Sequence, residues 1–149
     1  MKSIFEPDVF KDTLDRLDSL QPGAARQWGK MSASQMMEHT ARAAEMALGR
    51  GKQKQILIGK LIGWTVKRRF MGEQPFSKNG PTGPDFIVRD EPDFAATKMR
   101  LVGIVRELHA KGEAGTHGNV HGFFGTMTGE QWGITQYKHI DHHLRQFGA

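Results

Sequence analysis

Histidine is the residue type that could give this 149-residue chain its chemistry. The sequence contains seven histidines and no cysteine. The lack of cysteine excludes disulfides, a thiolate nucleophile and any cysteine-containing zinc site, so imidazole and carboxylate groups are the strong metal ligands available. Three histidines lie within five residues, in the stretch YKHIDHHLRQFG at 137–148. These three are the first candidates for a metal site.

Their spacing predicts which of them share a helix face. In a helix of roughly 3.6 residues per turn, His139 and His143 lie one turn apart, whereas His142 points about 100° away from His143. On a helical wheel that starts at Trp132, His139 and His143 fall at the centre of the inward apolar stripe and His142 falls at its border. The same arithmetic places His39 on the buried face of an earlier helix.

Three inward histidines, His39, His139 and His143, predict a site for a divalent metal ion. A single histidine on an apolar face is usually a core residue hydrogen-bonded to a carbonyl group or water, and this alternative stays open for His39 taken alone. The i, i+4 pair favours a metal because two buried imidazoles without partners would be costly. Three imidazoles leave one or more positions for water or substrate. Such sites accept several ions, of which we expect zinc or nickel.

Two further histidines, His142 and His121, are candidate catalytic residues. His142 could act as a general base or as a hydrogen-bond partner of a ligand; an exposed or purely structural role is the alternative. His121 lies in a glycine-rich loop, from which it could reach the mouth of the site, although such glycines also make ordinary turns. Gln136 and Gln146 flank the inward stripe and could orient a ligand, but for Gln146 we favour a helix-end role.

Five segments with helical apolar spacing must position these residues. They begin near Pro7, Ser32, Ile56, Pro92 and Thr128, and they end near Leu20, Leu48, Met71, the KGEAG stretch at 111–115 and Phe147. Ser32 with Gln35, and Thr128 with Gln131, have the spacing of a capping box, in which both side chains bond the free backbone N–H groups at a helix start. The two helices that carry the inward histidines therefore have well-defined beginnings.

The third segment, residues 56–71, is predicted to be a helix with an apolar face formed by Leu57, Leu61 and Trp64. Its basic end, Lys-Arg-Arg at 67–69, suits the negative end of the helix dipole. A contact of Arg68 or Arg69 with an anionic small molecule is one alternative to a solvated helix end. Dimerisation through this apolar, glycine-containing helix is another open alternative.

Scarce period-two alternation predicts an all-α fold, an antiparallel four-helix bundle with an additional shorter helix. Two long glycine-rich loops complete it, at 72–90 and 116–127. The first loop is too long for a plain connector and is of the kind that covers or lines a site. The length fits a single domain over residues 1–149.

The net charge of +5 raises the question of an anionic partner. The excess is concentrated in Lys52, Lys54, Lys60 and residues 67–69. No aromatic-interleaved nucleic-acid motif accompanies these cations, so nucleic acid is ranked last among the partners. No signal peptide or membrane-spanning stretch is recognised, which predicts a cytoplasmic protein without a membrane partner.

Three stretches, MSASQMMEHTARAAEMALG, GPTGPDF and HGFFGTMTGEQWGITQYKHIDHHLRQFG, resemble a bacterial family of unknown function within the DinB-like superfamily of damage-inducible four-helix-bundle proteins. The resemblance covers nearly the whole chain, and a tryptophan seven residues before HxxHHxxQ is its most specific feature. It implies metal ligands at His39, His139 and His143. The family pattern has proline where this sequence has Gly122, which puts a functional role of the adjacent His121 in doubt.

The resemblance also implies a candidate activity, because the superfamily includes metal-dependent transferases that use low-molecular-weight thiols such as bacillithiol or mycothiol. A metal-bound thiol would become a thiolate nucleophile, whereas a metal-bound water would give a hydrolase acting on a small-molecule substrate. The ligand set does not distinguish these two reactions. A non-catalytic bundle that serves as a binding or stress-associated module is the further alternative.

Overall fold

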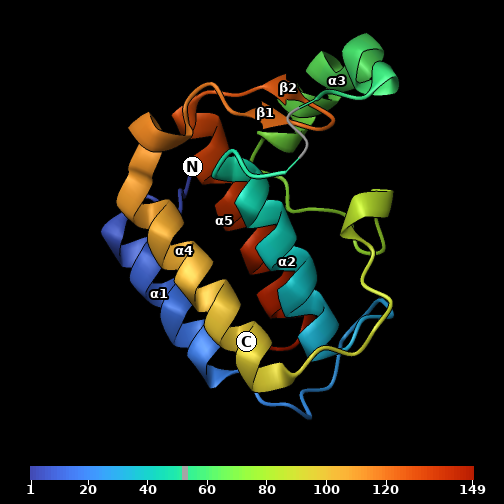
Figure 1. Ribbon diagram of the computed structural model, residues 1–149, viewed down its shortest axis with the longest axis vertical. Coiled ribbons are helices and arrows are strands. Elements are labelled where there is room, and N and C mark those ends of the chain that lie inside the picture. Colours follow the sequence, from blue (N-terminus) through green and yellow to red (C-terminus); the bar gives the residue numbers. More distant parts are fainter. Residues whose placement is uncertain (52–53) are drawn as a thin grey trace.

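Helices make up most of the chain, which a computed structural model describes over residues 1–51 and 54–149. Figure 1 shows the five α-helices of this part of the chain: α1 (Pro7–Ser19), α2 (Ala33–Ala47), α3 (Leu57–Phe70), α4 (Phe94–Thr116) and α5 (Gly129–Gln146). A 3-10 turn, η1 (Pro84–Phe86), and two short strands, β1 (Val120–His121) and β2 (Gly125–Thr126), complete the described elements. The predicted helical segments are confirmed, with small shifts at their ends.

Side-chain caps explain where α2, α4 and α5 begin. The Ser32 side chain accepts a hydrogen bond from the Gln35 backbone N–H at 3.1 Å, and the Gln35 side chain accepts one from Ser32 in return, so α2 opens with a capping box. Thr128 and Gln131 form the same reciprocal pair at the start of α5. At α4, the cap is Asp93, whose carboxylate accepts from the third residue of the helix.

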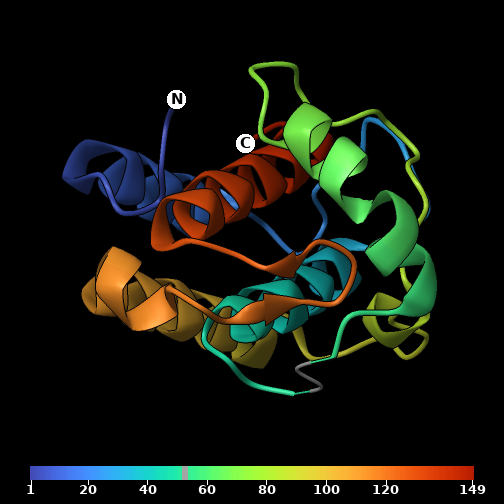
Figure 2. The same ribbon diagram turned by 90° about the horizontal axis from the view of Figure 1, so that it is seen from above.

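Helices α1, α2, α4 and α5 pack against one another around a shared core. Figures 1 and 2 show these four helices alongside each other, and α2 makes its most extensive contact with α4. Trp132 of α5 is fully buried, as are Leu101, Val105 and Leu108 of α4. The core thus holds α2 and α5 in contact, which positions their histidines.

The loop at 116–127, predicted to be irregular, contains a β-hairpin. β1 pairs with β2 in antiparallel register, Val120 opposite Thr126 and His121 opposite Gly125. Gly125 has a φ of 72°, a backbone conformation that favours glycine. Strands of two residues are too short to show an alternating pattern, which is why the sequence did not reveal them.

The end of α4 also differs in part from the expectation. The KGEAG stretch at 111–115 was predicted to end this helix, but helical structure continues to Thr116. The regular backbone is interrupted at Gly112, with φ of 61° and ψ of −163°. The stretch therefore kinks the helix one turn before it stops.

The apolar face of α3 is turned away from the core, although an apolar helix face usually turns inward. Leu57, Leu61 and Trp64 are 79%, 76% and 71% exposed, and the buried residues of this helix are Gly59 and Gly63. Both glycines lie against the backbone carbonyl of Phe123, in the hairpin turn. Close approach of two backbones requires residues without a Cβ, so the glycine face is the one that packs.

Figure 1 shows α3 beside the hairpin at one end of the molecule. Lys52, one of the cations noted in the sequence, lies outside the described residues. Within the described residues, no helix combines the length and apolar character needed to cross a membrane.

The packing of α3 predicts opposite effects for two glycine-to-alanine changes. Gly103→Ala in α4 adds a Cβ in open space and should raise the free energy of unfolding by about 0.5–1 kcal/mol, because alanine is the better helix former. Gly59→Ala places a Cβ onto the Phe123 carbonyl and should loosen α3 at a cost of about 1–3 kcal/mol. Urea unfolding and hydrogen exchange of the α3 amides measure both; equal stabilisation by the two changes would disprove the glycine contact.

Candidate metal centre

Three histidine side chains from α2 and α5 meet in the interface between these helices. The Nε2 atom of His139 lies 3.0 Å from Nε2 of His39 and 3.2 Å from Nε2 of His143. Across the whole trio, the ring nitrogens that could serve as ligands lie within 4.8 Å of one another. His39 and His143 are buried and His139 is partly exposed. The sequence predicted these three residues, and the structure brings them together.

The spacing of these nitrogen atoms is compatible with a shared metal ion. Two zinc–imidazole bonds of about 2.0–2.1 Å at a tetrahedral angle place their nitrogen atoms roughly 3.3–3.4 Å apart. The two Nε2–Nε2 distances to His139 are slightly shorter than this separation. The three histidines could therefore hold one divalent ion.

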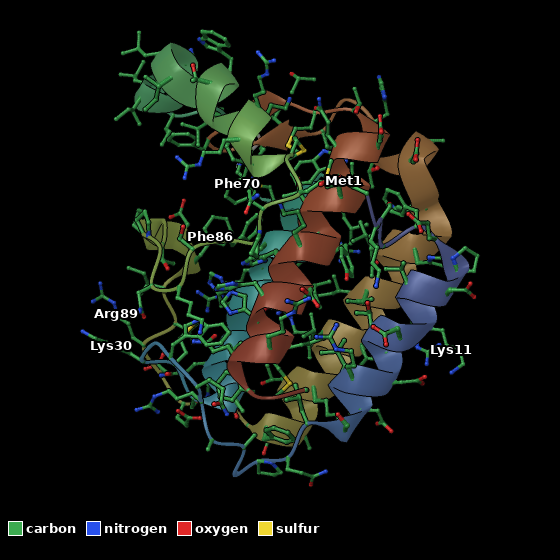
Figure 3. The ribbon with its side chains drawn as sticks, turned by 180° about the vertical axis from the view of Figure 1, so that it is seen from behind. Met1, Lys11, Lys30, Phe70, Phe86 and Arg89 are labelled. Atoms are coloured by element: carbon green, nitrogen blue, oxygen red, sulfur yellow. The ribbon has the colours of Figure 1, made fainter. Side chains whose placement is uncertain are left out.

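A backbone carbonyl fixes the tautomer of His39. Its Nδ1 lies 3.0 Å from the carbonyl oxygen of Phe86, in η1 of the loop at 72–90. A carbonyl oxygen only accepts hydrogen bonds, so Nδ1 carries the proton and Nε2 presents its lone pair to the other histidines. Figure 3 shows the loop segment with Phe86 beside the α2–α5 pair. The loop at 72–90, which was expected to cover or line a site, contacts the trio through this main-chain oxygen.

A side-chain amide fixes the tautomer of His143. Its Nδ1 lies 2.9 Å from Oε1 of Gln146, whose Nε2 donates to the Trp28 carbonyl at 2.8 Å. The second bond determines which end of the amide faces His143, so Nδ1–H is the donor and Nε2 again presents a lone pair. Gln146, for which a helix-end role was favoured, is the last residue of α5 and also orients a candidate ligand.

The proton count at the centre favours a cation. His139 can place at most one proton on its Nε2 when neutral, so the two neighbouring lone pairs must either share one N–H in weak hydrogen bonds or leave one lone pair without a donor. A divalent ion would satisfy all three nitrogen atoms at once.

Burial keeps these imidazoles neutral. Desolvation lowers the pKa of His39, against the opposing effect of its hydrogen bond to Phe86. Desolvation, reinforced by His39, lowers the pKa of His143 to about 3. The pKa of His139 is well below its usual value, because of desolvation and then the neighbouring histidines. Neutral imidazole is the form that binds metals.

His142 lies beside the trio and lines an open cleft. Its ring centroid is 5.1 Å from that of His143 and 5.4 Å from that of Trp28. The residue is half-buried, and desolvation lowers its pKa. The cleft, of about 550 Å³, lies along the outer face of α5. His142 thus borders both the candidate ligands and a space large enough for a small molecule.

The cleft has aromatic walls and a cationic lining. A lysine Nζ lies over each of three rings, at 4.5 Å for Lys78 over Trp28, 5.0 Å for Lys138 over Phe76 and 5.8 Å for Lys2 over Tyr137. Of its two acidic residues, Glu73 and Asp141, the latter is already bound by Arg16 and Arg145. Arg68 and Arg69, for which contact with an anionic small molecule was one alternative, lie on α3 and are not part of this lining.

His121 has a different environment. Its Nδ1 accepts backbone hydrogen bonds from Phe123 at 3.1 Å and from Phe124 at 3.2 Å, and its ring stacks on the ring of Phe124. Burial lowers the pKa of His121 to about 4. These contacts hold the hairpin turn, and His121 does not join the candidate ligand group.

Gln136 contributes a buried polar atom without a partner. Its Nε2 donates to the Ala43 carbonyl at 3.2 Å, whereas Oε1 has no hydrogen-bond partner among the described residues. Gln136 precedes His139 by one helical turn, and Ala43 follows His39 by one turn, so this amide lies next to the trio along the same interface. A buried acceptor of this kind is usually satisfied by water or a ligand.

Comparison with protein-family models gives a match over most of the chain. A family model described as a protein of unknown function (DUF1569) matches residues 7–149, a span that includes all three candidate ligands. No curated protein and no solved structure matches the chain significantly.

The lowered histidine pKa values predict that acid destabilises the metal-free protein. Below the ordinary histidine pKa of about 6.5, the unfolded chain takes up protons that the folded trio does not bind. The free energy of unfolding therefore decreases as the pH is lowered, until the pH reaches the folded-state pKa. For His143 alone, the loss at pH 5 should be about 2 kcal/mol. Thermal unfolding with a chelator measures it. His143→Gln should flatten the pH dependence, and the exposed His117→Gln should not; an equal slope in all three proteins would contradict the assignment.

The contact of Gln146 with His143 predicts a graded effect on metal affinity. Gln146→Leu removes the acceptor that orients the imidazole and should weaken binding about 10–100-fold. Gln146→Glu keeps an acceptor for Nδ1–H and should retain most of the affinity. Competition with a chromophoric chelator separates the variants, and equal affinity in both would show that Gln146 does not orient the ligand.

Proposed function

The chain belongs to the family of proteins of unknown function DUF1569, and we propose that it is a metal-dependent enzyme that acts on an anionic small molecule. His39, His139 and His143 would hold the divalent ion. The observation that carries this proposal is the convergence of three Nε2 atoms, two of them in tautomers fixed by Phe86 and Gln146.

The number of ligands supports a catalytic ion over a structural one. Structural zinc sites are usually closed by four protein ligands, whereas catalytic sites use three and keep a position for water or substrate. Among the described residues, the candidate group contains three histidines and no fourth histidine or carboxylate. The unpartnered Oε1 of Gln136 offers a nearby acceptor for a bound water or substrate.

We propose transfer of a low-molecular-weight thiol as the reaction. A divalent ion lowers the pKa of a bound thiol or water, and the protein has no cysteine of its own to act as nucleophile. The lysines of the cleft would bind carboxylate or phosphate groups of the thiol or its acceptor. Hydrolysis by an activated water uses the same ligands and is the alternative reaction.

His142 is the residue we propose for proton transfer. It lies between the candidate ligands and the cleft, and its lowered pKa leaves it neutral near pH 7, the form that accepts a proton. His121 is the weaker candidate because its Nδ1 is already used by two backbone N–H groups of the hairpin turn.

We further propose that α1, α2, α4 and α5 form an antiparallel four-helix bundle of the DinB-like type, with α3 as the additional shorter helix. The mutual packing of these four helices and the HxxHHxxQ pattern at 139–146 support this proposal. The same resemblance supports the thiol as co-substrate.

Two variants separate metal binding from catalysis. Protein purified without a histidine tag should contain about one equivalent of divalent metal by elemental analysis, and His143→Gln should abolish it. His142→Gln should keep the metal but slow the conjugation of a small thiol to 1-chloro-2,4-dinitrobenzene about 10²–10⁴-fold. Metal content unaffected by His143→Gln would refute the site, and full activity in His142→Gln would refute its proton-transfer role.

A further inference from the structure

Helix α3 presents its large apolar side chains to the outside of the molecule. Leu57, Leu61 and Trp64 are its most exposed apolar residues, and Ile56, Ile58 and Ile62 are exposed as well. Scattered exposed apolar residues are normal on a protein surface, but a contiguous group on one helix marks an interaction site.

The most exposed apolar side chains of α3, those of Leu57, Leu61 and Trp64, point away from its contact with the rest of the protein. The helix packs through Gly59 and Gly63 against the Phe123 carbonyl. Additional hydrogen bonds to the backbone of residues 122–126 come from Gln55, Ile56 and Lys67, at 2.9 Å each. Since the attachment uses the opposite side of the helix, the apolar face is available for a partner without any rearrangement.

The charge around this face has a single sign. Residues 54–72 contain Lys54, Lys60, Lys67, Arg68 and Arg69 and no aspartate or glutamate. Cations beside leucine, isoleucine and tryptophan side chains are the features of a helix that lies in the interface of an anionic membrane. Tryptophan is enriched at this depth of a bilayer.

We propose that α3 docks on the surface of an anionic lipid bilayer. Leu57, Leu61 and Trp64 would enter the boundary between headgroups and acyl chains, while Lys60 and Arg68 would contact lipid phosphates. Figures 1 and 3 show α3 projecting beyond the ends of α2 and α5, so a flat surface can reach its outer side. The helix would lie on the membrane surface. The sequence-based prediction of no membrane partner concerned helices that span the bilayer.

The charges favour a lipid surface over a second copy of the chain. Two copies paired through α3 would bring their lysines and arginines together, and the segment has no acidic residue to pair with them. Like charges held close across an interface are unfavourable. An anionic bilayer provides apolar depth and complementary charge together.

Vesicle flotation with the full-length protein tests the proposal. The protein should float with vesicles of phosphatidylcholine mixed with phosphatidylglycerol, and much less with phosphatidylcholine alone. Leu61→Gln should reduce partitioning about tenfold, because it replaces an inserted apolar side chain. Lys60→Gln and Arg68→Gln should each reduce it about fivefold, and high salt should weaken binding of the unchanged protein.

Two matched controls lie on other helices. Met99→Gln removes an exposed apolar side chain from α4, and Lys11→Gln removes an exposed cation from α1; neither should alter partitioning. Equal binding to both kinds of vesicle, or equal loss in controls and α3 variants, would overturn the proposal. The proposal would also be overturned if the protein did not float with vesicles and instead sedimented as a dimer that Leu61→Gln dissociates.

Discussion

A single N–H satisfies two nitrogen lone pairs only weakly, and the arrangement around the histidine trio depends on this constraint. The Phe86 carbonyl directs the lone pair of His39 inward, and Gln146 does the same for His143. Both point at the single Nε2 of His139. Hydrogen bonds within the trio satisfy these lone pairs poorly, whereas a cation would bind all three nitrogen atoms. The reason is that Phe86 and Gln146 turn the Nε2 lone pairs of their histidines inward.

The rest of the fold supplies the rigidity that this centre needs. The two helices that carry the candidate ligands, α2 and α5, both begin with a capping box, which fixes where each helix starts and thus the direction of every later side chain. Core packing holds them in contact. The segments outside the helices then contribute single atoms, the carbonyl oxygens of Phe86 and Trp28. Ligands on packed helices with bonded partners behind them are held more precisely than ligands on loops.

Sequence periodicity could predict the candidate ligands because these three histidines follow it. His39, His139 and His143 lie on apolar faces of long, well-capped helices, where roughly 3.6 residues per turn determines direction. The Phe86 carbonyl could not be predicted, since every residue has one. The role of Gln146 depends on Trp28, far away in the sequence, so residue spacing contains no signal for it. In α3 the pattern showed two unlike faces, but the rule that the apolar face turns inward failed, because the glycine face allows the closer backbone contact.

The adjacent pair His142–His143 links the buried centre to the open cleft through helix geometry alone. Consecutive residues on a helix point about 100° apart, so when His143 faces the trio, His142 must face the edge of the interface. There it meets Trp28, whose ring forms part of the cleft wall and whose carbonyl holds Gln146. Trp28 therefore supports the imidazole of His143 through Gln146, and it also borders the cleft beside His142. A small molecule that moved Trp28 would thus act on the orientation of a candidate ligand without touching it.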